Sequence, residues 1–473
     1  MVTDMTVGNP TKLIMKFAFP LLIGNIFQQL YNLSDIVIVG RLIGVHALAA
    51  VGASAPLFFM LLLITLGFTG GLTVVTAQRF GAKDPEGVRK SVTHSVMASS
   101  VLSFAITAFM TVFTTQVLKM MNVPEDIMAD AYTFIFLLSL GLPLIVCYNL
   151  LSGFIRALGD SKTPLYFLIF SSVLNILLNL VLIYYAGMGV AGSALGTIIA
   201  ISISVICCVY YIGRKFPILK LKKSDWAFDA KLMNEHLNIA FPMSLQFSII
   251  AVGLMIIQSV CNSFGKDVIA AFTAALRLEQ LGTQPLLALG LAIATYSAQN
   301  YGAGMIARIR KGVFFSSIYS VTFSILLALL VRFVGEEMIG IFLKEGNDNI
   351  IKIAKDYLNI STMFYLFLGQ IFIFRNALQG MGRTKIPLLA CVVELIVRSL
   401  AAIILAKQIG YIGICYASPI AWVGAALVVT IGYVIVIRKM KKHYWSNQIK
   451  KIRSRFKREE NILLEHTSHN RES

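Results

Sequence analysis

The polar residues within the first apolar stretch of the chain have the types and spacing needed to exchange a cation. They recur every three or four residues, which places them on one face of an α-helix; they are Asn25, Gln28, Asn32 and Asp35, with Gln29 and Tyr31 beside them. Because no cation on this stretch can neutralise Asp35, its carboxyl group either keeps a proton or shares a bound cation. We expect Asp35 to couple H⁺ or Na⁺ movement to another process; a hydrogen-bonded structural acid is the alternative.

A second polar stripe, formed by Ser171, Asn175 and Asn179, has a four-residue spacing. Asn amides join helices to one another in lipid, which gives this stripe a structural explanation. If the stripe faces Asp35, its amide carbonyls instead complete an oxygen site for Na⁺. The candidate cation-coupling set is therefore Asp35, Asn32, Asn175 and Asn179, with Asp35 as the metal ligand if the ion is Na⁺.

A third stripe lies in the second half of the chain and consists of Thr273, Arg277, Gln280 and Gln284. Its helical spacing indicates one face, which we expect to line a cavity wall. The candidate substrate-cavity residues are Gln28, Tyr31, Arg277, Gln280 and Gln284.

Two further charged residues at membrane depth, Glu394 and Arg398, are four residues apart in the order that favours an ion pair on a helix. We expect them to form a structural pair. A shift of 222 residues from Asp35 reaches Ile257, so the coupling acid has no counterpart in the second half. The coupling chemistry is therefore expected in the first half.

The composition shows which elements must position these residues. The chain of 473 residues is 57% apolar and 14% charged, against about 45–50% and about 25% in soluble domains. This excludes a soluble enzyme, a disordered scaffold, a disulfide-stapled secreted domain and a coiled coil. Twelve apolar stretches are long enough to span a bilayer, at about 13–38, 50–77, 91–117, 131–155, 164–186, 190–213, 237–262, 270–298, 311–334, 356–379, 386–407 and 413–437.

The Lys and Arg residues of the chain are concentrated in the connections on one side of the predicted membrane spans. Lys and Arg are several times more frequent in the connections on the side of both termini than in the others, which predicts a multi-pass protein of the plasma or bacterial inner membrane with both termini cytoplasmic. The net charge of +18 is then no sign of a nucleic-acid partner. The basic segment 441–473 is expected to rest on anionic lipid headgroups.

The two halves repeat one another. "AFP" at 18–20 recurs at 240–242, "AQRFGA" at 77–82 recurs as "AQNYGA" at 298–303, and "GDSKTP" at 159–164 recurs as "GRTKIP" at 382–387. Each unit contains six stretches, so both units have the same orientation in the membrane and enclose a V-shaped cavity. We predict an all-α fold with an N-terminal lobe at 1–215, a linker at 216–236, a C-terminal lobe at 237–440 and a tail at 441–473.

This duplicated plan indicates a carrier, and several other classes of protein lack their signatures. No nucleotide-binding loop is present, and no His, Asp and Glu cluster lies at membrane depth. We therefore expect no enzyme activity, no cofactor and a monomer. Pro20 and Pro242 occupy matching positions in the first helix of each unit, where they are candidates for gating bends.

The sequence resembles the multidrug and toxic compound extrusion (MATE) family. The resemblance covers about residues 8–440 and is carried by "AFPLLIGNIFQQLYNLSDIVIVGRLIGVHALAAVGAS", "AQRFGAKD", "RALGDSKTP" and "GMGVAGSALGT", with "AFP", "AQNYGAG" and "QGMGRTKIP" in the second half. It implies a cation-coupled antiporter. The DinF-type branch has an acid that matches Asp35 and an Asn–Asp pair that matches Asn175 and Asn179; the second position is Asn here. The acids of NorM-like members have no match.

We therefore expect export of amphipathic or cationic organic compounds, including drugs, in exchange for H⁺ or Na⁺. The alternative is a flippase for lipid-linked oligosaccharides, which has a similar two-bundle plan. Such a flippase would favour an arginine-rich cavity for phosphates, and only Arg277 is well placed in this sequence.

Overall fold

The computed structural model describes residues 3–340 and 348–469, leaving out the side chains of residues 32, 33, 35–37, 45 and 443–469. Within these residues every regular element is a helix, as predicted. The N-terminal half comprises α1 (Pro10–Leu42), α2 (Val45–Gly81), α3 (Pro85–Met120), α4 (Glu125–Leu140), α5 (Leu142–Ala157), α6 (Lys162–Asn179), the π-helix η1 (Leu180–Tyr185) and α7 (Gly189–Lys215). The C-terminal half comprises α8 (Ala230–Asn262), α9 (Lys266–Gly302), α10 (Ile306–Gly340), α11 (Asp348–Met363), α12 (Tyr365–Gly380), α13 (Lys385–Ile409) and α14 (Tyr411–His469).

The helix lengths of the two halves repeat. α1 and α8 have 33 residues each, α2 and α9 have 37 each, and α4, α5, α11 and α12 have 16 each. The α4–α5 and α11–α12 pairs are bent by 46° and 50°. Two turns, η2 (Pro217–Leu219) and η3 (Lys223–Trp226), connect α7 to α8, which begins within the stretch assigned above to the linker.

Twelve membrane spans were expected from the sequence. Among the described residues, nine single helices and the two bent pairs are long and apolar enough to cross a membrane. The one expected stretch not among them is 270–298, which corresponds to α9. It is long enough but carries many polar residues, among them Arg277, Glu279 and Gln284. A helix with so polar a face needs protein or water beside that face rather than lipid.

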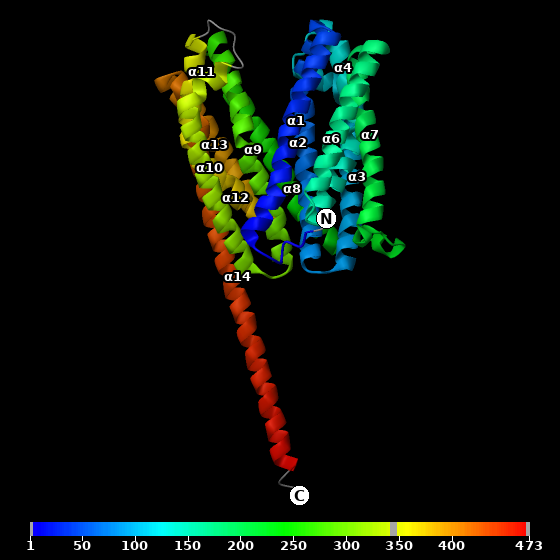
Figure 1. Ribbon diagram of the computed structural model, residues 1–473, viewed down its shortest axis with the longest axis vertical. Coiled ribbons are helices and arrows are strands. Elements are labelled where there is room, and N and C mark those ends of the chain that lie inside the picture. Colours follow the sequence, from blue (N-terminus) through cyan, green and yellow to red (C-terminus); the bar gives the residue numbers. More distant parts are fainter. Residues whose placement is uncertain (1–2, 341–347, 470–473) are drawn as a thin grey trace.

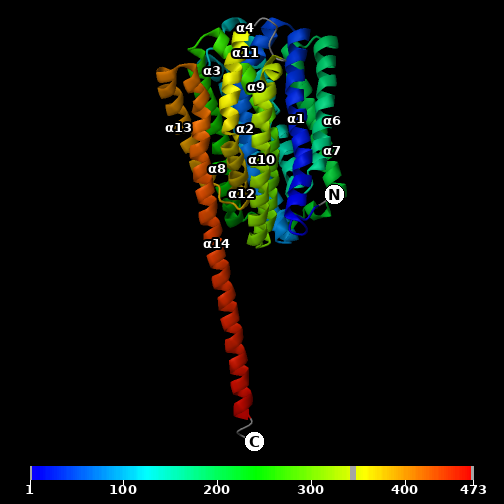
Figure 2. The same cartoon turned by 60° about the vertical axis from the view of Figure 1, so that its left-hand side comes forward.

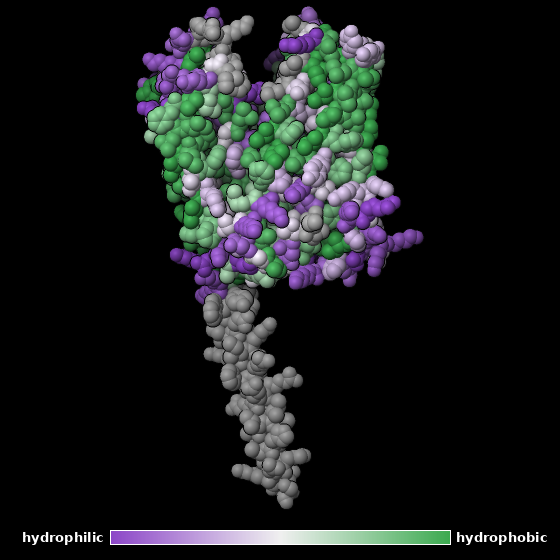
Figure 3. Space-filling model, in the orientation of Figure 1, coloured by the Kyte–Doolittle hydropathy of each residue, from purple (hydrophilic) through white to green (hydrophobic). Residues whose placement is uncertain are grey.

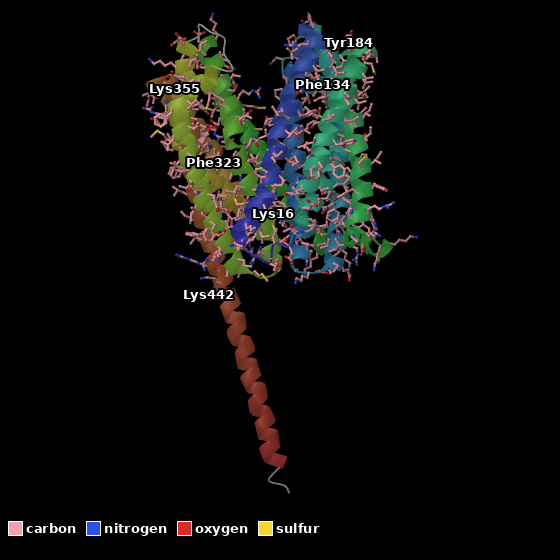
Figure 4. The ribbon with its side chains drawn as sticks, in the orientation of Figure 1. Lys16, Phe134, Tyr184, Phe323, Lys355 and Lys442 are labelled. Atoms are coloured by element: carbon pink, nitrogen blue, oxygen red, sulfur yellow. The ribbon has the colours of Figure 1, made fainter. Side chains whose placement is uncertain are left out.

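The bundle has two distinct ends. α14 projects far beyond one of them, which we term the tail end (Figures 1 and 2). Figure 4 places Tyr184 and Lys355 on the two halves at the opposite end, termed the open end, and Lys442 where α14 leaves the bundle. The surface between the two ends is largely hydrophobic, and the molecule is hollowed between its halves at the open end (Figure 3).

The first helix of each half packs against the other half near the tail end. Ile14 and Phe17 of α1 belong to a buried cluster with Tyr296 of α9 and Trp422 of α14. Ala240 of α8 belongs to a cluster made otherwise of residues from the N-terminal half and the linker. This exchange of first helices brings the two halves together at the tail end and leaves them apart at the open end.

Candidate functional site

The α1 stripe lies on a helix that packs against both α6 and α9. Gln28 and Tyr31 are half-buried there. Asn32 and Asp35 belong to α1, but their side chains lie outside the described residues. The structure therefore brings the α1 backbone beside α6, the helix that carries Asn175 and Asn179. The predicted oxygen site between α1 and α6 requires these two helices to be neighbours.

The predicted cavity stripe on α9 divides into two parts. Arg277 and Gln280 are exposed. Gln284 is only 7% exposed, and its Nε2 donates a 2.9 Å hydrogen bond to the carbonyl oxygen of Gln280 in the same helix. Since α9 borders the hollow between the halves (Figures 1 and 3), Arg277 and Gln280, together with the exposed Thr273 of the same stripe, are accessible from solvent.

A buried chain of amide and hydroxyl groups joins α6 to α7 in the N-terminal half. Nδ2 of Asn175 donates to Oγ1 of Thr197 at 3.0 Å, and Nδ2 of Asn179 donates to Oδ1 of Asn175 at 3.1 Å. Thr197 Oγ1 in turn donates to the carbonyl oxygen of Ser193 at 3.1 Å. Asn175 and Asn179 are 2% and 0% exposed, so the predicted pair forms one continuous polar group of neutral side chains.

Local backbone features allow this chain to form. A Cβ at Gly196 would lie 2.2 Å from Oδ1 of Asn179, so only glycine admits the amide at this distance from α7. The helix changes from α to π directly after Asn179, a local widening that is frequent at functional sites. Thr197 was missed as a site residue, although it ends the "GMGVAGSALGT" motif; an isolated Thr among small residues carries no polar spacing of its own.

The C-terminal half contains buried charged side chains, in contrast to the neutral amides and hydroxyls between α6 and α7. Arg398 Nη2 donates to Oε1 of Glu394, which confirms the predicted ion pair, and both residues are less than 10% exposed. Glu279 of α9 and the hydroxyl of Tyr357 in α11 form a 2.7 Å hydrogen bond. Tyr357 could not be identified from the sequence because it lies far from Glu279 along the chain and belongs to no polar stripe.

The tail end is closed by two reciprocal glutamines of the repeated motifs. Gln78 of α2 donates through Nε2 to the carbonyl oxygen of Gly380 at 2.8 Å, and Gln299 of α9 donates through Nε2 to the carbonyl oxygen of Ala157 at 2.8 Å. Each glutamine thus reaches from its own half to the end of the bent helix pair in the other half. The contacts obey the same two-fold relation as the sequence repeat.

Two glycines let the α2 and α9 backbones touch at this closure. A Cβ at Gly81 would lie 1.9 Å from the carbonyl oxygen of Gln299, and a Cβ at Gly302 would lie 1.8 Å from that of Gln78. Real Cβ atoms do not approach so closely, so any larger residue must separate the helices. These glycines belong to the repeated motifs, but their role was not recognised from the sequence.

The predicted gating prolines lie inside the first helix of each half. Pro20 and Pro242 are internal to α1 and α8, each of which continues as one helix beyond its proline. Close to Pro242, a Cβ at Gly71 would lie 2.5 Å from Cα of Ala240. Pro242 is therefore next to a close contact between the halves, and Ala18 and Leu21 beside Pro20 belong to the buried cluster shared with the C-terminal half.

The linker and α8 add ion pairs at the tail end. Arg79 and Glu235 are 2.7 Å apart. The Asp225 carboxylate accepts hydrogen bonds from the Lys222 backbone N–H at 2.8 Å and from Arg89 Nε at 3.0 Å. These contacts hold the pKa of Asp225 below its ordinary value, so this carboxylate stays charged at neutral pH.

A duplicated helical bundle, open at one end and closed at the other by breakable contacts between its halves, has the architecture of an alternating-access membrane transporter. The chain belongs to the MatE family, whose model matches residues 20–181 and 242–404. It is similar to two proteins of Bacillus subtilis (strain 168): the "Probable multidrug resistance protein YpnP", 29% identical with 80% of this chain and 84% of the relative covered, and the "Probable multidrug resistance protein YoeA", 28% identical with 78% and 81% covered.

A solved structure titled "Outward-facing conformation of a multidrug resistance MATE family transporter of the MOP superfamily" has the same fold. Its TM-score is 0.86 at 23% identity, with 93% of this chain and 98% of that chain covered. The similarity in fold therefore includes both halves.

Proposed function

We propose that this MATE transporter exports amphipathic or cationic organic compounds, including drugs, in exchange for H⁺ or Na⁺. The observation that carries the proposal is the hollow between the halves at one end together with the reciprocal seal at the other, in a chain of the MatE family. The multidrug resistance named for the two Bacillus subtilis relatives supports the solute class.

The orientation follows from the charge distribution. The tail end carries most Lys and Arg residues and is assigned to the cytoplasm, with both termini, in the plasma membrane. The structure then corresponds to a conformation open to the outside. Arg277 and Gln280 on α9, with Gln28 and Tyr31 on α1, are the proposed solute-binding residues of the cleft.

We assign ion coupling to Asp35 in the N-terminal half. Support comes from the packing of its helix against α6 and from the neutral amide–hydroxyl chain that lies on α6 and α7. A carboxyl group beside such oxygens can hold a proton or, with them, Na⁺. The acid on the first helix and the absence of an acid between residues 237 and 262 favour the DinF-type branch.

The proposed cycle links ion uptake to solute release. Solute binds while the cleft opens to the cytoplasm, and the bundle then rocks to the conformation described here. Uptake of the cation at Asp35 weakens solute binding and returns the carrier. When an uncharged solute leaves, one elementary charge that moves inward supplies about 2.3 kcal/mol per 100 mV, a solute gradient of roughly fiftyfold. Exchange for a monovalent cationic solute moves no net charge, so the concentration gradient of the coupled ion must supply the energy.

The family match and the named relatives favour drug export over the flippase considered above. Each copy of the chain contains both halves and a complete cleft, so a monomer is the proposed functional unit. No step of the cycle requires a cofactor.

Transport by purified protein in liposomes tests the proposal. A panel of fluorescent cationic dyes is followed under a pH gradient and, separately, under a sodium gradient. We expect dye movement against its own gradient under one of the two. Movement under neither, together with translocation of a pyrophosphoryl-linked lipid, would replace the proposal by the flippase.

A further inference from the structure

Seven residues that precede α1 form a short segment on the tail end, residues Thr3–Asn9, which we term the strap. Met5 in its middle is completely buried and Thr6 is 4% exposed. The Met5 side chain belongs to the cluster that contains Tyr296 and Ile309 of the C-terminal half. A segment that leads into the N-terminal half is thus anchored in the core of the other half.

Polar groups of α9 and α10 hold the strap backbone. The Met5 N–H donates to Oε1 of Gln299 at 2.9 Å, and the Met5 carbonyl oxygen accepts from Nδ2 of Asn300 at 3.1 Å and from Nη2 of Arg308 at 3.1 Å. Nη1 of Arg308 donates to the carbonyl oxygen of Gly8 at 2.9 Å. The planar guanidinium of Arg308 therefore binds two carbonyl oxygens of the strap, those of Met5 and Gly8, in a fixed geometry.

The orientation of Arg308 is itself fixed. Its Nε donates to Oδ1 of Asn300 at 3.0 Å. Its backbone carbonyl oxygen accepts from the hydroxyl of Tyr296 at 2.9 Å. A half-buried arginine with all of these contacts has few alternative positions, so it serves as a rigid clamp.

The strap also touches the N-terminal half. Gly159, between α5 and α6, has a φ of +83°, and a Cβ there would lie 2.0 Å from the carbonyl oxygen of Thr3. The Gln299 amide that accepts from Met5 N–H donates to Ala157 in the same N-terminal loop region. Strap, N-terminal half and C-terminal half therefore meet at one side chain.

The repeat supplies an internal comparison. Asn9 caps α1 and Asp229 caps α8, so the linker residues before Asp229 are the counterpart of the strap. The linker is likewise held by an arginine near the start of the third helix of the opposite half, Arg89, through Asp225. The linker is covalently tied to both halves, whereas the strap depends on its hydrogen bonds to hold them together.

We propose that the strap is a latch for the tail end, with Arg308 as the positioning residue that sets the balance between the two orientations of the carrier. The latch rests on the proposed alternating access. Closure of the strap over Gln299 stabilises the conformation described here, and its release permits opening toward the cytoplasm. Loss of the Arg308 clamp therefore shifts the population toward the tail-open state.

The test measures the accessibility of two introduced cysteines to a maleimide in nanodiscs, where both faces are reachable. Ala298→Cys reports on the tail end, where Ala298 is 1% exposed, and Thr273→Cys reports on the exposed face of α9 near the open end. The parent chain, with its six cysteines, gives the background rate. Each reporter is combined with Arg308→Gln, with deletion of residues 2–6, or with the matched control Arg310→Gln, which alters an exposed arginine of the same helix.

With Arg308→Gln we expect labelling at residue 298 to rise about tenfold, the scale of lost hydrogen bonds to a charged group, and labelling at residue 273 to fall. The deletion should act in the same direction, and Arg310→Gln should change neither rate. A rise at both reporters indicates a loosened fold and overturns the latch. Unchanged labelling rates in both Arg308→Gln and the deletion variant also overturn the latch. A rise at residue 298 without a fall at residue 273 overturns it as well, because the strap would then only shield residue 298 from the reagent.

The experiment needs no solute and no ion gradient. If the labelling shifts as expected while the unmodified chain transports nothing, the latch stands and the proposed function fails. If transport occurs and the labelling does not shift, the latch fails alone.

Discussion

The interiors of the two halves can be compared position by position because their helices repeat. Between α6 and α7 of the N-terminal half the buried polar contacts join amides and hydroxyls, from Asn179 through Asn175 to Thr197. In the C-terminal half they include a full ion pair, Glu394 with Arg398, and a carboxyl group bound to a phenol. At the tail end, by contrast, both halves use the same glutamine and glycine contacts.

This comparison indicates which parts of a duplicated carrier are free to diverge. The closure is made by both halves at once, so each half must keep its share of it. The interior polar groups of one half can be specialised for ion coupling while those of the other half hold helices together. The predictions below address the shared closure first and the divergent interiors second.

The largest effect is expected when alanine replaces Gly81 or Gly302, the two glycines at which α2 and α9 touch. Gly302→Ala and Gly81→Ala each place a Cβ within 2 Å of a backbone oxygen of the opposite half, so the tail end cannot close. We expect dye efflux from liposomes to fall more than about tenfold, since several packed contacts are lost together. The matched control is Gly213→Ala, near the tail end of α7, where an added Cβ meets nothing within 4 Å.

The two glycine variants also test the symmetry of the closure. Because the two contacts are equivalent, their effects should be similar. Normal efflux by one variant and loss in the other would show that only one half forms the seal.

A smaller effect is expected from breaking the charged pair of the C-terminal half. Arg398→Met leaves the Glu394 carboxylate buried without its partner, which costs about 3 kcal/mol of stability. Thermal unfolding in detergent measures this loss. The double variant Glu394→Gln with Arg398→Met should recover most of it, whereas equal unfolding temperatures for the single variant and the unmodified protein would exclude a structural role for the pair.

The smallest effect on stability is expected in the N-terminal half. Thr197→Val removes the hydroxyl that binds Asn175 at 3.0 Å and keeps the shape of the side chain, so we expect a loss of about 1 kcal/mol. The same variant should change the ion dependence of efflux, because it alters the oxygens beside α1. If Thr197→Val lost as much stability as Arg398→Met and left the ion dependence of efflux unchanged, the polar groups of the two halves would have the same structural role, and the proposed difference between the halves would be wrong.

Much of the fold could be predicted from the sequence. Apolar length gave the helices, and motifs such as "AQRFGA" and "AQNYGA" gave the duplication, because both signals are local in the chain. α9 was expected as a span from its length even though its polar face lowers its apolarity. The bends between α4 and α5 and between α11 and α12 were not foreseen, since each lies inside a continuous apolar stretch.

The candidate site was predictable only in part. Asn175 and Asn179 stand out because their spacing follows one helix face, and the pair of Glu394 and Arg398 follows from the same rule. Thr197, Tyr357 and the strap contacts of Arg308 depend on which helices meet in space. One-dimensional spacing holds no information about such partners from distant parts of the chain.

The central claim, that Asp35 couples ion movement to export, is tested most directly by gradient-driven dye efflux of Asp35→Asn in liposomes. Glu279→Gln, which removes the acid bound to Tyr357 in the other half, is the matched control, and both proteins are inserted in equal amounts. We predict that Asp35→Asn abolishes efflux under whichever of the pH and sodium gradients drives the unmodified protein, while Glu279→Gln retains it. Undiminished efflux by Asp35→Asn would contradict the claim.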